Sequence, residues 1–173
     1  MPVATEQVAA APLVGGGQTA LHSHAGGGGE SELLVVKSAD TANSTTTLAD
    51  ADGLSFTALA NKTYLIEAWV RYGTSATTVG IKLSINGPVS PAFVCGLWDV
   101  NAAQGTPDGG AFNGYDVAIA SSAAPFLADN LARLWCLFRN GGTEGPVVIR
   151  FAAETTGTVT VKTGSCMRYR QVD

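Results

Sequence analysis

The stretch TYLIEAWVRY, residues 63–72, alternates between two kinds of side chain with a period of two. Successive side chains of an extended strand point to opposite faces of its sheet. One set is apolar or aromatic and consists of Tyr64, Ile66, Ala68, Val70 and Tyr72. Glu67 and Arg71 belong to the other set. The pattern predicts a β-strand that packs one face against a core.

The same kind of sequence continues on both sides of this stretch. In residues 78–85, Ile81, Leu83 and Ile85 alternate with Lys82 and Ser84. Short runs rich in Val, Ile, Thr and aromatic residues are bounded by Gly, Asn, Asp or Pro, which is typical of strands and turns. The remaining runs expected to form strands are 33–37, 46–48, 54–59, 93–100, 115–120, 131–139, 147–153, 158–163 and 166–172. About eight to ten strands predict an all-β fold, an antiparallel β-sandwich or jelly roll.

Three segments between these runs are expected to be turns or loops. The sequence DADG, residues 50–53, is similar to the start of a calcium loop but lacks the later oxygen ligands, so we expect a turn. The sequence NAAQGTPDGG, residues 101–110, should form an exposed loop. Residues 126–130 suit a turn or a short helix. The strand at 131–139 is favoured over a longer helix because NGG follows it directly.

Residues 1–30 differ from the rest of the chain and are expected to form an extended N-terminal arm before a β-sandwich domain at 31–173. Residues 1–20 are rich in Ala, Val, Gly and Pro and show no period of 2 or 3.6. Such a segment buries too little apolar surface to offset its ordering entropy, so it is either disordered or docked on a neighbouring subunit. We expect docking in an assembly.

The sequence LHSHAGGGG, residues 21–29, joins the arm to the domain and contains both histidines of the chain. In an extended backbone His22 and His24 point to the same side. Two ligands are too few for a stable transition-metal site, but three chains on one axis would supply six imidazoles. We therefore consider a structural transition-metal ion shared across a trimer axis. The alternative is a flexible linker that holds two incidental histidines.

Composition narrows the classes of function. The chain of 173 residues is 46% hydrophobic and only 14% charged, which favours a homo-oligomer with surface hidden in an assembly. The net charge of −4 argues against nucleic acid as a partner. No run reaches the roughly 18 apolar residues of a membrane span. The first residues lack a basic region and a long apolar run, so we expect folding in the cytoplasm of the producing cell.

Few residues in the sequence suit catalysis. With both histidines in the joint, a Ser-His-Asp or Cys-His hydrolase would have to take its base from outside the β domain. The cysteines lie in apolar runs at wide spacing, so buried free thiols are expected rather than disulfides or a zinc site; they are Cys95, Cys136 and Cys166. We expect no catalytic residue and no enzyme.

Two further sets of side chains are candidates for contacts with a partner. The three tryptophans, Trp69, Trp98 and Trp135, suit either a sugar-stacking surface or, more commonly, a core or interface. Five arginines near the end of the chain suit an intersubunit face, a site for an acidic partner, or ordinary solvated surface. They are Arg133, Arg139, Arg150, Arg168 and Arg170.

The sequence NGGTEGPVVIRFAAETTGTVTVKTGSCMRYRQV, residues 140–172, resembles the C-terminal part of small β-sandwich modules in virion proteins of tailed bacteriophages. The matching features are an NGGT-x-G turn, a strand like VVIRFAAE, a TGTVTV strand and a closing basic and aromatic strand. Residues 35–72 are similar to the first half of the same module. LHSHAGGGG is similar to H-x-H segments of phage fibres and spikes, in which trimers bind iron or another metal on the axis.

The resemblance implies a structural protein of the virion, made in the host cytoplasm. With a single H-x-H and no long shaft, the chain is most similar to a trimeric capsid decoration or cement protein, or a short head fibre, whose partner is the major capsid protein or another virion protein. One alternative is a tail-fibre or tail-tip adhesin that binds a host surface glycan. A second alternative is a virion-associated glycan hydrolase. His22 and His24 alone inherit a metal-binding role.

Overall fold

The computed structural model describes residues 32–173, and this part of the chain is built from β-strands and their connections. The strands are β1 (Leu33–Val36), β2 (Thr41–Asn43), β3 (Ala49–Ala58), β4 (Thr63–Thr74), β5 (Ile81–Asn86), β6 (Phe93–Ala103), β7 (Thr106–Phe112), β8 (Ile119–Ala120), β9 (Asn130–Arg139), β10 (Gly145–Ala153), β11 (Val159–Val161) and β12 (Cys166–Gln171). No helix in residues 32–173 is long and apolar enough to cross a membrane.

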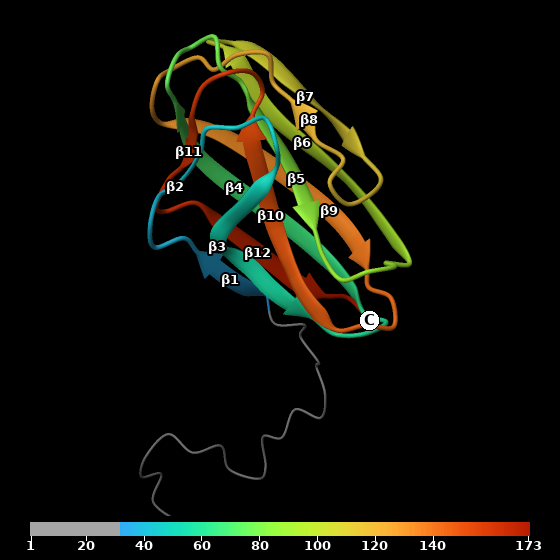
Figure 1. Ribbon diagram of the computed structural model, residues 1–173. Helices are drawn as coiled ribbons and strands as arrows, with labels where there is room; N and C mark the ends of the chain where they lie inside the picture. The colour runs from blue at the N-terminus through green and yellow to red at the C-terminus, as the bar shows by residue number, and fades with distance from the viewer. Residues whose placement is uncertain (1–31) are drawn as a thin grey trace, which may run out of the picture.

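The strands form two antiparallel sheets that pack on each other (Figure 1). The large sheet has the order β1-β12-β4-β9-β6-β7, with β11 pairing to both β4 and β2. The small sheet has the order β3-β10-β5-β8 and lies in front of the large sheet in this view. The prediction of an all-β antiparallel sandwich is confirmed. The expected N-terminal arm lies outside the described residues.

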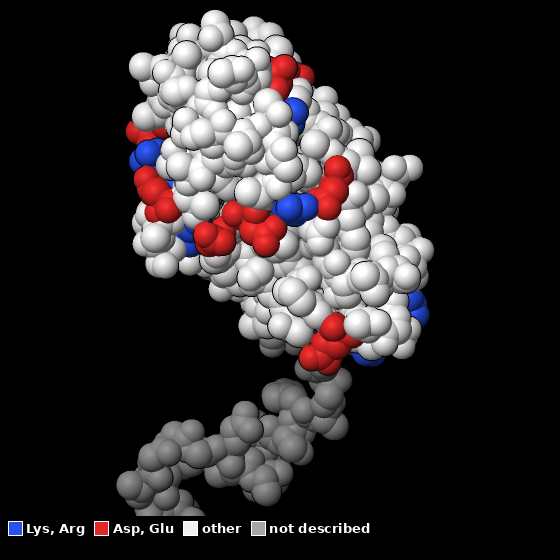
Figure 2. Space-filling view, viewed as in Figure 1, with Lys and Arg blue, Asp and Glu red and all other residues white. Residues whose placement is uncertain are grey.

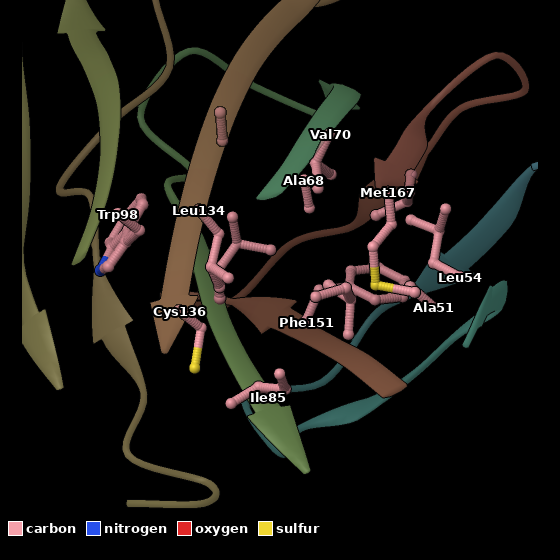
Figure 3. Close-up of a cluster of buried hydrophobic side chains, with 14 of the residues drawn as sticks. Ala51, Leu54, Ala68, Val70, Ile85, Trp98, Leu134, Cys136, Phe151 and Met167 are labelled. Carbon is pink, nitrogen blue, oxygen red and sulfur yellow. The ribbon is translucent and has the colours of Figure 1, made fainter. Parts of the chain in front are cut away.

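The core lies between the two sheets, where the apolar set of each strand points. In β4 the residues Tyr64, Ile66, Ala68, Val70 and Tyr72 are all buried. Phe151 and Ile85 from the small sheet pack in the same cluster as Leu134 and Met167 from the large sheet (Figure 3). Burial of each large apolar side chain contributes about 1.5–3 kcal/mol to the free energy of unfolding. The alternation in residues 63–72 and 78–85 therefore identified core residues correctly.

In the large sheet, β1 and β2 follow one another along one line, and β12 and β11 lie beside them along the neighbouring line. Both lines are interrupted at the same position. Val36 pairs with Cys166 and Thr41 with Val161, so residues 37–40 lie opposite residues 162–165. Backbone hydrogen bonds join the two segments. Lys37 N donates to Ser165 O at 2.8 Å, and Gly164 N donates to Lys37 O at 3.0 Å. We call these two segments the paired interruption.

Side chains also hold the paired interruption. The Asp40 carboxylate accepts hydrogen bonds from Thr163 N at 2.7 Å and from Lys162 Nζ at 3.2 Å, which keep the pKa of Asp40 below its usual value. Lys37 is only 2% exposed, and its Nζ donates to Thr41 Oγ1 at 2.6 Å and to the Asp52 carbonyl oxygen. Burial lowers the pKa of Lys37, although Asp52 and Asp40 oppose the shift.

Three expectations about connections need correction. The DADG segment, residues 50–53, lies inside β3 and forms a bulge, because Arg150 pairs with Asp50 whereas Val148 pairs with Ser55. Residues 101–110 are exposed for the most part but belong to a hairpin of β6 and β7 rather than to a loop. Of residues 115–120, only Ile119 and Ala120 form a strand. Gly53 and Gly105, both at positive φ, provide the bulge and the tight turn.

We predict that Gly53→Ala lowers the free energy of unfolding by about 1–2 kcal/mol, because a Cβ is disfavoured in the left-handed region. Gly53 has a φ of 81° and the nearest atom to an added Cβ is 3.9 Å away, so the cost comes from the backbone and not from a clash. Gly142→Ala is the matched control, since Gly142 has open space around it and lies outside that region of φ. Urea unfolding of both variants measures the difference, and equal midpoints would contradict this account of the bulge.

Candidate interaction surface

The large sheet has a second face that points away from the small sheet, and we call it the outer face. The alternation that turns Tyr64 and Ile66 inward turns Leu65, Glu67 and Trp69 outward. Strand pairing places side chains of the neighbouring strands beside them. The outer face comprises Leu34, Val36, Leu65, Glu67, Trp69, Arg71, Phe93, Cys95, Leu97, Asp99, Leu131, Arg133, Trp135, Leu137, Arg139, Cys166, Arg168 and Arg170.

Large apolar side chains are exposed across the outer face. Leu34 is 63% exposed and Leu97 58%, and Val36, Leu131, Phe93 and Leu137 are also exposed. An antiparallel sheet that covers a core on one side normally presents polar side chains to water on the other. Isolated exposed apolar residues need no explanation, but a contiguous set of them marks a contact surface.

Two acidic residues of the outer face are paired with arginines of the same face. Arg168 Nε donates to Glu67 Oε2 at 2.9 Å, and Arg133 Nε donates to Asp99 Oδ1 at 2.9 Å. These hydrogen bonds raise the pKa of both guanidinium groups. Each acid lies directly opposite its arginine on the neighbouring strand, which favours the pairing. Among the charged residues of the outer face, Arg170 alone has no ion-pair partner within residues 32–173.

Both outward tryptophans are covered on one side by the paired arginines. The guanidinium carbon of Arg168 lies 4.9 Å from the ring centroid of Trp69, and that of Arg133 lies 5.0 Å from Trp135. This cation–π geometry fixes long side chains flat on the sheet. Arginine and tryptophan are the residue types most enriched in the parts of protein interfaces that contribute most affinity.

An apolar hollow lies at the end of the outer face near β6 and β7. Its volume is about 390 Å³, and its lining includes Leu65, Cys95, Leu97, Trp135 and Leu137. We call it the apolar hollow. A smaller hollow of about 270 Å³ between Asp99, Leu131 and Arg133 is polar on one side. The outer face is therefore apolar but uneven.

The opposite side of the molecule is different in character. The outward residues of the small sheet include the polar residues Ser55, Thr57 and Lys82, with Pro146 and Val148 beside them. Arg150 forms ion pairs with Asp50 at 3.0 Å and Asp116 at 2.7 Å. On this side the acidic and basic atoms adjoin one another and are few (Figure 2). The contrast makes the outer face of the large sheet the candidate functional site.

The structure separates the tryptophans and arginines that the sequence suggested. Trp98 is 2% exposed and belongs to the core, whereas Trp69 and Trp135 lie on the outer face. Four of the five arginines lie on the outer face, and Arg150 lies on the small sheet. Because arginines cover the two outward rings, their arrangement suits a protein interface better than a sugar-stacking platform.

The prediction of buried free thiols was right for one cysteine of three. Cys136 is buried, but Cys95 is exposed and Cys166 is partly exposed, and all three are free. The reason is strand parity, since Cys95 and Cys166 point to the outer face while Cys136 points to the core. An apolar run does not bury its outward residues when the sheet has only one covered face.

Most of the outer face was missed in the sequence, although a signal was present. In residues 63–72 the positions between the core residues hold Leu65 and Trp69 as well as the charged residues. In residues 131–139 the outward positions likewise hold Leu131, Trp135 and Leu137. Apolar residues at both parities of two paired strands indicate a sheet with two covered faces.

The candidate metal ligands His22 and His24 lie outside the described residues. Within residues 32–173, no group of three or more His, Cys, Asp or Glu side chains is arranged to hold a metal ion. A comparison of the chain with protein-family models and with curated proteins returned no match.

We predict that Cys136 resists alkylation in the native protein at pH 8 and reacts only after unfolding. Burial raises the pKa of its thiol to about 12, so the reactive thiolate is scarce, and the core excludes the reagent. Mass spectrometry after iodoacetamide treatment, with and without denaturant, locates the modified cysteines. Native labelling of Cys136 at the rate of an unfolded thiol would show that the core opens near β9.

Proposed function

We propose that this protein is a non-enzymatic structural protein of a bacteriophage virion, a homotrimer that binds the capsid exterior and stabilises the shell. The outer face of the large sheet is the observation that carries the proposal. It combines exposed leucines with arginines and tryptophans that are already fixed in place. Such a surface suits stable contact with protein.

Energetics support a covered outer face. Each Å² of apolar surface removed from water contributes about 25 cal/mol. Covering the exposed leucines of the outer face therefore favours the free energy of association. Covering these ion pairs costs less than covering unpaired charges, because the guanidinium and carboxylate groups already bind each other before a partner arrives. A protein that functions in an assembly gains this contribution when its surface is covered.

The virion setting is supported by the resemblance of residues 35–72 and 140–172 to β-sandwich modules of phage virion proteins. The strands of that resemblance are β2, β3, β4, β10, β11 and β12 with the end of β1, and they build parts of both sheets. The low content of charged residues fits a subunit that is surrounded by other protein. The major capsid protein or another virion protein is the proposed partner for shell binding.

We predict that cryo-electron microscopy of intact particles places hundreds of copies on the shell in groups of three, because a decoration protein follows the capsid lattice. A phage with Leu97→Arg on the outer face should lose these copies or the heat resistance of its shell. Val117→Arg is the control, since Val117 is 39% exposed but lies in the segment before β8 on the small sheet.

Two outcomes would contradict this proposal. A few copies at the tail tip would identify a receptor-binding adhesin instead of a decoration protein. Release of sugars from host-surface glycans by the purified chain would identify a hydrolase.

We also propose that His22 and His24 hold a structural metal ion on the trimer axis. Six imidazoles from three chains would fill an octahedral shell and leave no position for substrate. Elemental analysis of the full-length trimer should give about one metal ion for three chains, and His22→Ala with His24→Ala should remove it. Because protons compete with the metal for imidazole, acid should release the ion without unfolding the sandwich. A metal-free trimer would leave the histidines as part of a linker.

A further inference from the structure

The two ends of the outer face are unlike each other. At one end, the edge strand β1 presents Leu34 and Val36, which are 63% and 55% exposed. At the other end lies the apolar hollow beside β6 and β7. Between them stand the arginine and tryptophan pairs of β12, β4 and β9. The face thus has apolar side chains that project at one end and a space that accepts apolar side chains at the other.

We propose that the outer face binds a second copy of this chain head to tail, with Leu34 and Val36 of one copy against the apolar hollow of the next. A contact between two different patches repeats from copy to copy, and it forms a closed ring when the rotation between copies closes. In a ring of three, each patch contacts its complementary patch on a neighbouring copy. The inference rests on the proposed function, because it names the partner that covers the outer face.

The size of the outer face fits such a contact. The main path of the large sheet has six strands, and β9 is ten residues long. With strands about 4.8 Å apart and about 3.4 Å per residue, the face covers roughly 900 Å². Each partner in a stable protein interface buries about 800 Å². In a ring of three, the two ends of the face meet two different neighbours, which share this area between them.

The charges of the outer face also fit a second copy. A charged group that a second copy covers without a partner of opposite charge opposes association. On this face Glu67 and Asp99 are each bonded to an arginine of the same copy. Among residues 32–173, Arg170 forms no ion pair, but it is exposed and remains hydrated near the C-terminal end of β12. The paired charges allow two copies to approach.

The start of the described chain lies at the same end of the face. Glu32 directly precedes β1, and its Oε1 accepts a hydrogen bond from Arg168 Nη1 at 3.3 Å. The described chain therefore begins at the end of the outer face that the proposed contact covers.

A disulfide across the contact tests the proposal directly. We predict that the full chain with Leu34→Cys and Cys166→Ser forms a disulfide between residue 34 of one copy and Cys95 of the next. Copper phenanthroline under air is the oxidant, so that oxygen takes up the two protons and two electrons that the thiols release. Cys95 lines the apolar hollow, and buried Cys136 does not compete. Denaturing gels without reductant should show a covalent ring of three chains.

The control for this disulfide is Val89→Cys in the same Cys166→Ser background. Val89 is 71% exposed in the connection after β5, away from the outer face. Cys95→Ser should abolish the bands formed by Leu34→Cys. Cross-linking no faster than with Val89→Cys, or a disulfide within one chain, would overturn the proposal. The native shape of the circular-dichroism spectrum verifies that each variant is folded.

A second variant tests the same contact without oxidation. Leu34→Arg should convert the trimer to monomer in sedimentation at micromolar concentration, whereas Val89→Arg should leave the trimer intact. Leu34 is exposed on an edge strand, so its replacement disturbs the contact and not the core. A trimer that persists with Leu34→Arg, on particles that still carry the protein, would overturn this contact and leave the proposed virion function standing.

The rate of maleimide labelling at Cys95 in the unmodified chain distinguishes a second copy from the other occupants of the outer face. Cover by a second copy predicts slow labelling at high concentration and fast labelling after dilution. Slow labelling that does not change with dilution would assign the face to the chain's own N-terminal residues. Fast labelling at every concentration would assign it to another virion protein. Each of the last two results contradicts the proposed contact.

Discussion

The register between β4 and β9 is the constraint on which both faces of the large sheet depend. Ten consecutive pairs, from Thr63 with Arg139 to Tyr72 with Asn130, join the two strands without a break. A shift of one residue in a strand moves every side chain to the opposite face. The same pairing that buries Ile66 and Leu134 therefore also places Trp69 beside Arg133. The core and the outer face are both consequences of one alignment.

The two faces stabilise different states of the molecule. The inner face is removed from water when the single chain folds, and its burial contributes to the free energy of unfolding. The arginine pairs of the outer face are exposed, and exposed ion pairs of this kind contribute little to the free energy of unfolding. Their main effect is on conformation, because they hold Arg168 and Arg133 flat over Trp69 and Trp135. A partner then meets side chains that have already lost most of their freedom.

Sequence patterns predicted the architecture well because single-residue alternation directly reports which face is buried. This is why the inward residues of 63–72 and 78–85 and the strand at 131–139 were identified. The bulge at 50–53 and the hairpin at 101–110 were missed because glycine and aspartate occur both in turns and in irregular strands. The outer face was missed because its residues come from separate strands, and their assembly requires the strand order. The lining of the apolar hollow, from β4, β6 and β9, is an example of this.

The paired interruption has a consequence for the evolution of this protein. Residues 37–40 and 162–165 are equal in length and are tied to each other by Lys37, Asp40, Thr163 and Ser165. An insertion or deletion in one segment alone would shift the pairing of β1 with β12 or of β2 with β11, and the buried Lys37 would lose its oxygen partners. A matching change in the other segment restores both alignments. Lengths at these two places should therefore vary together among homologues, although 125 residues separate them in the sequence.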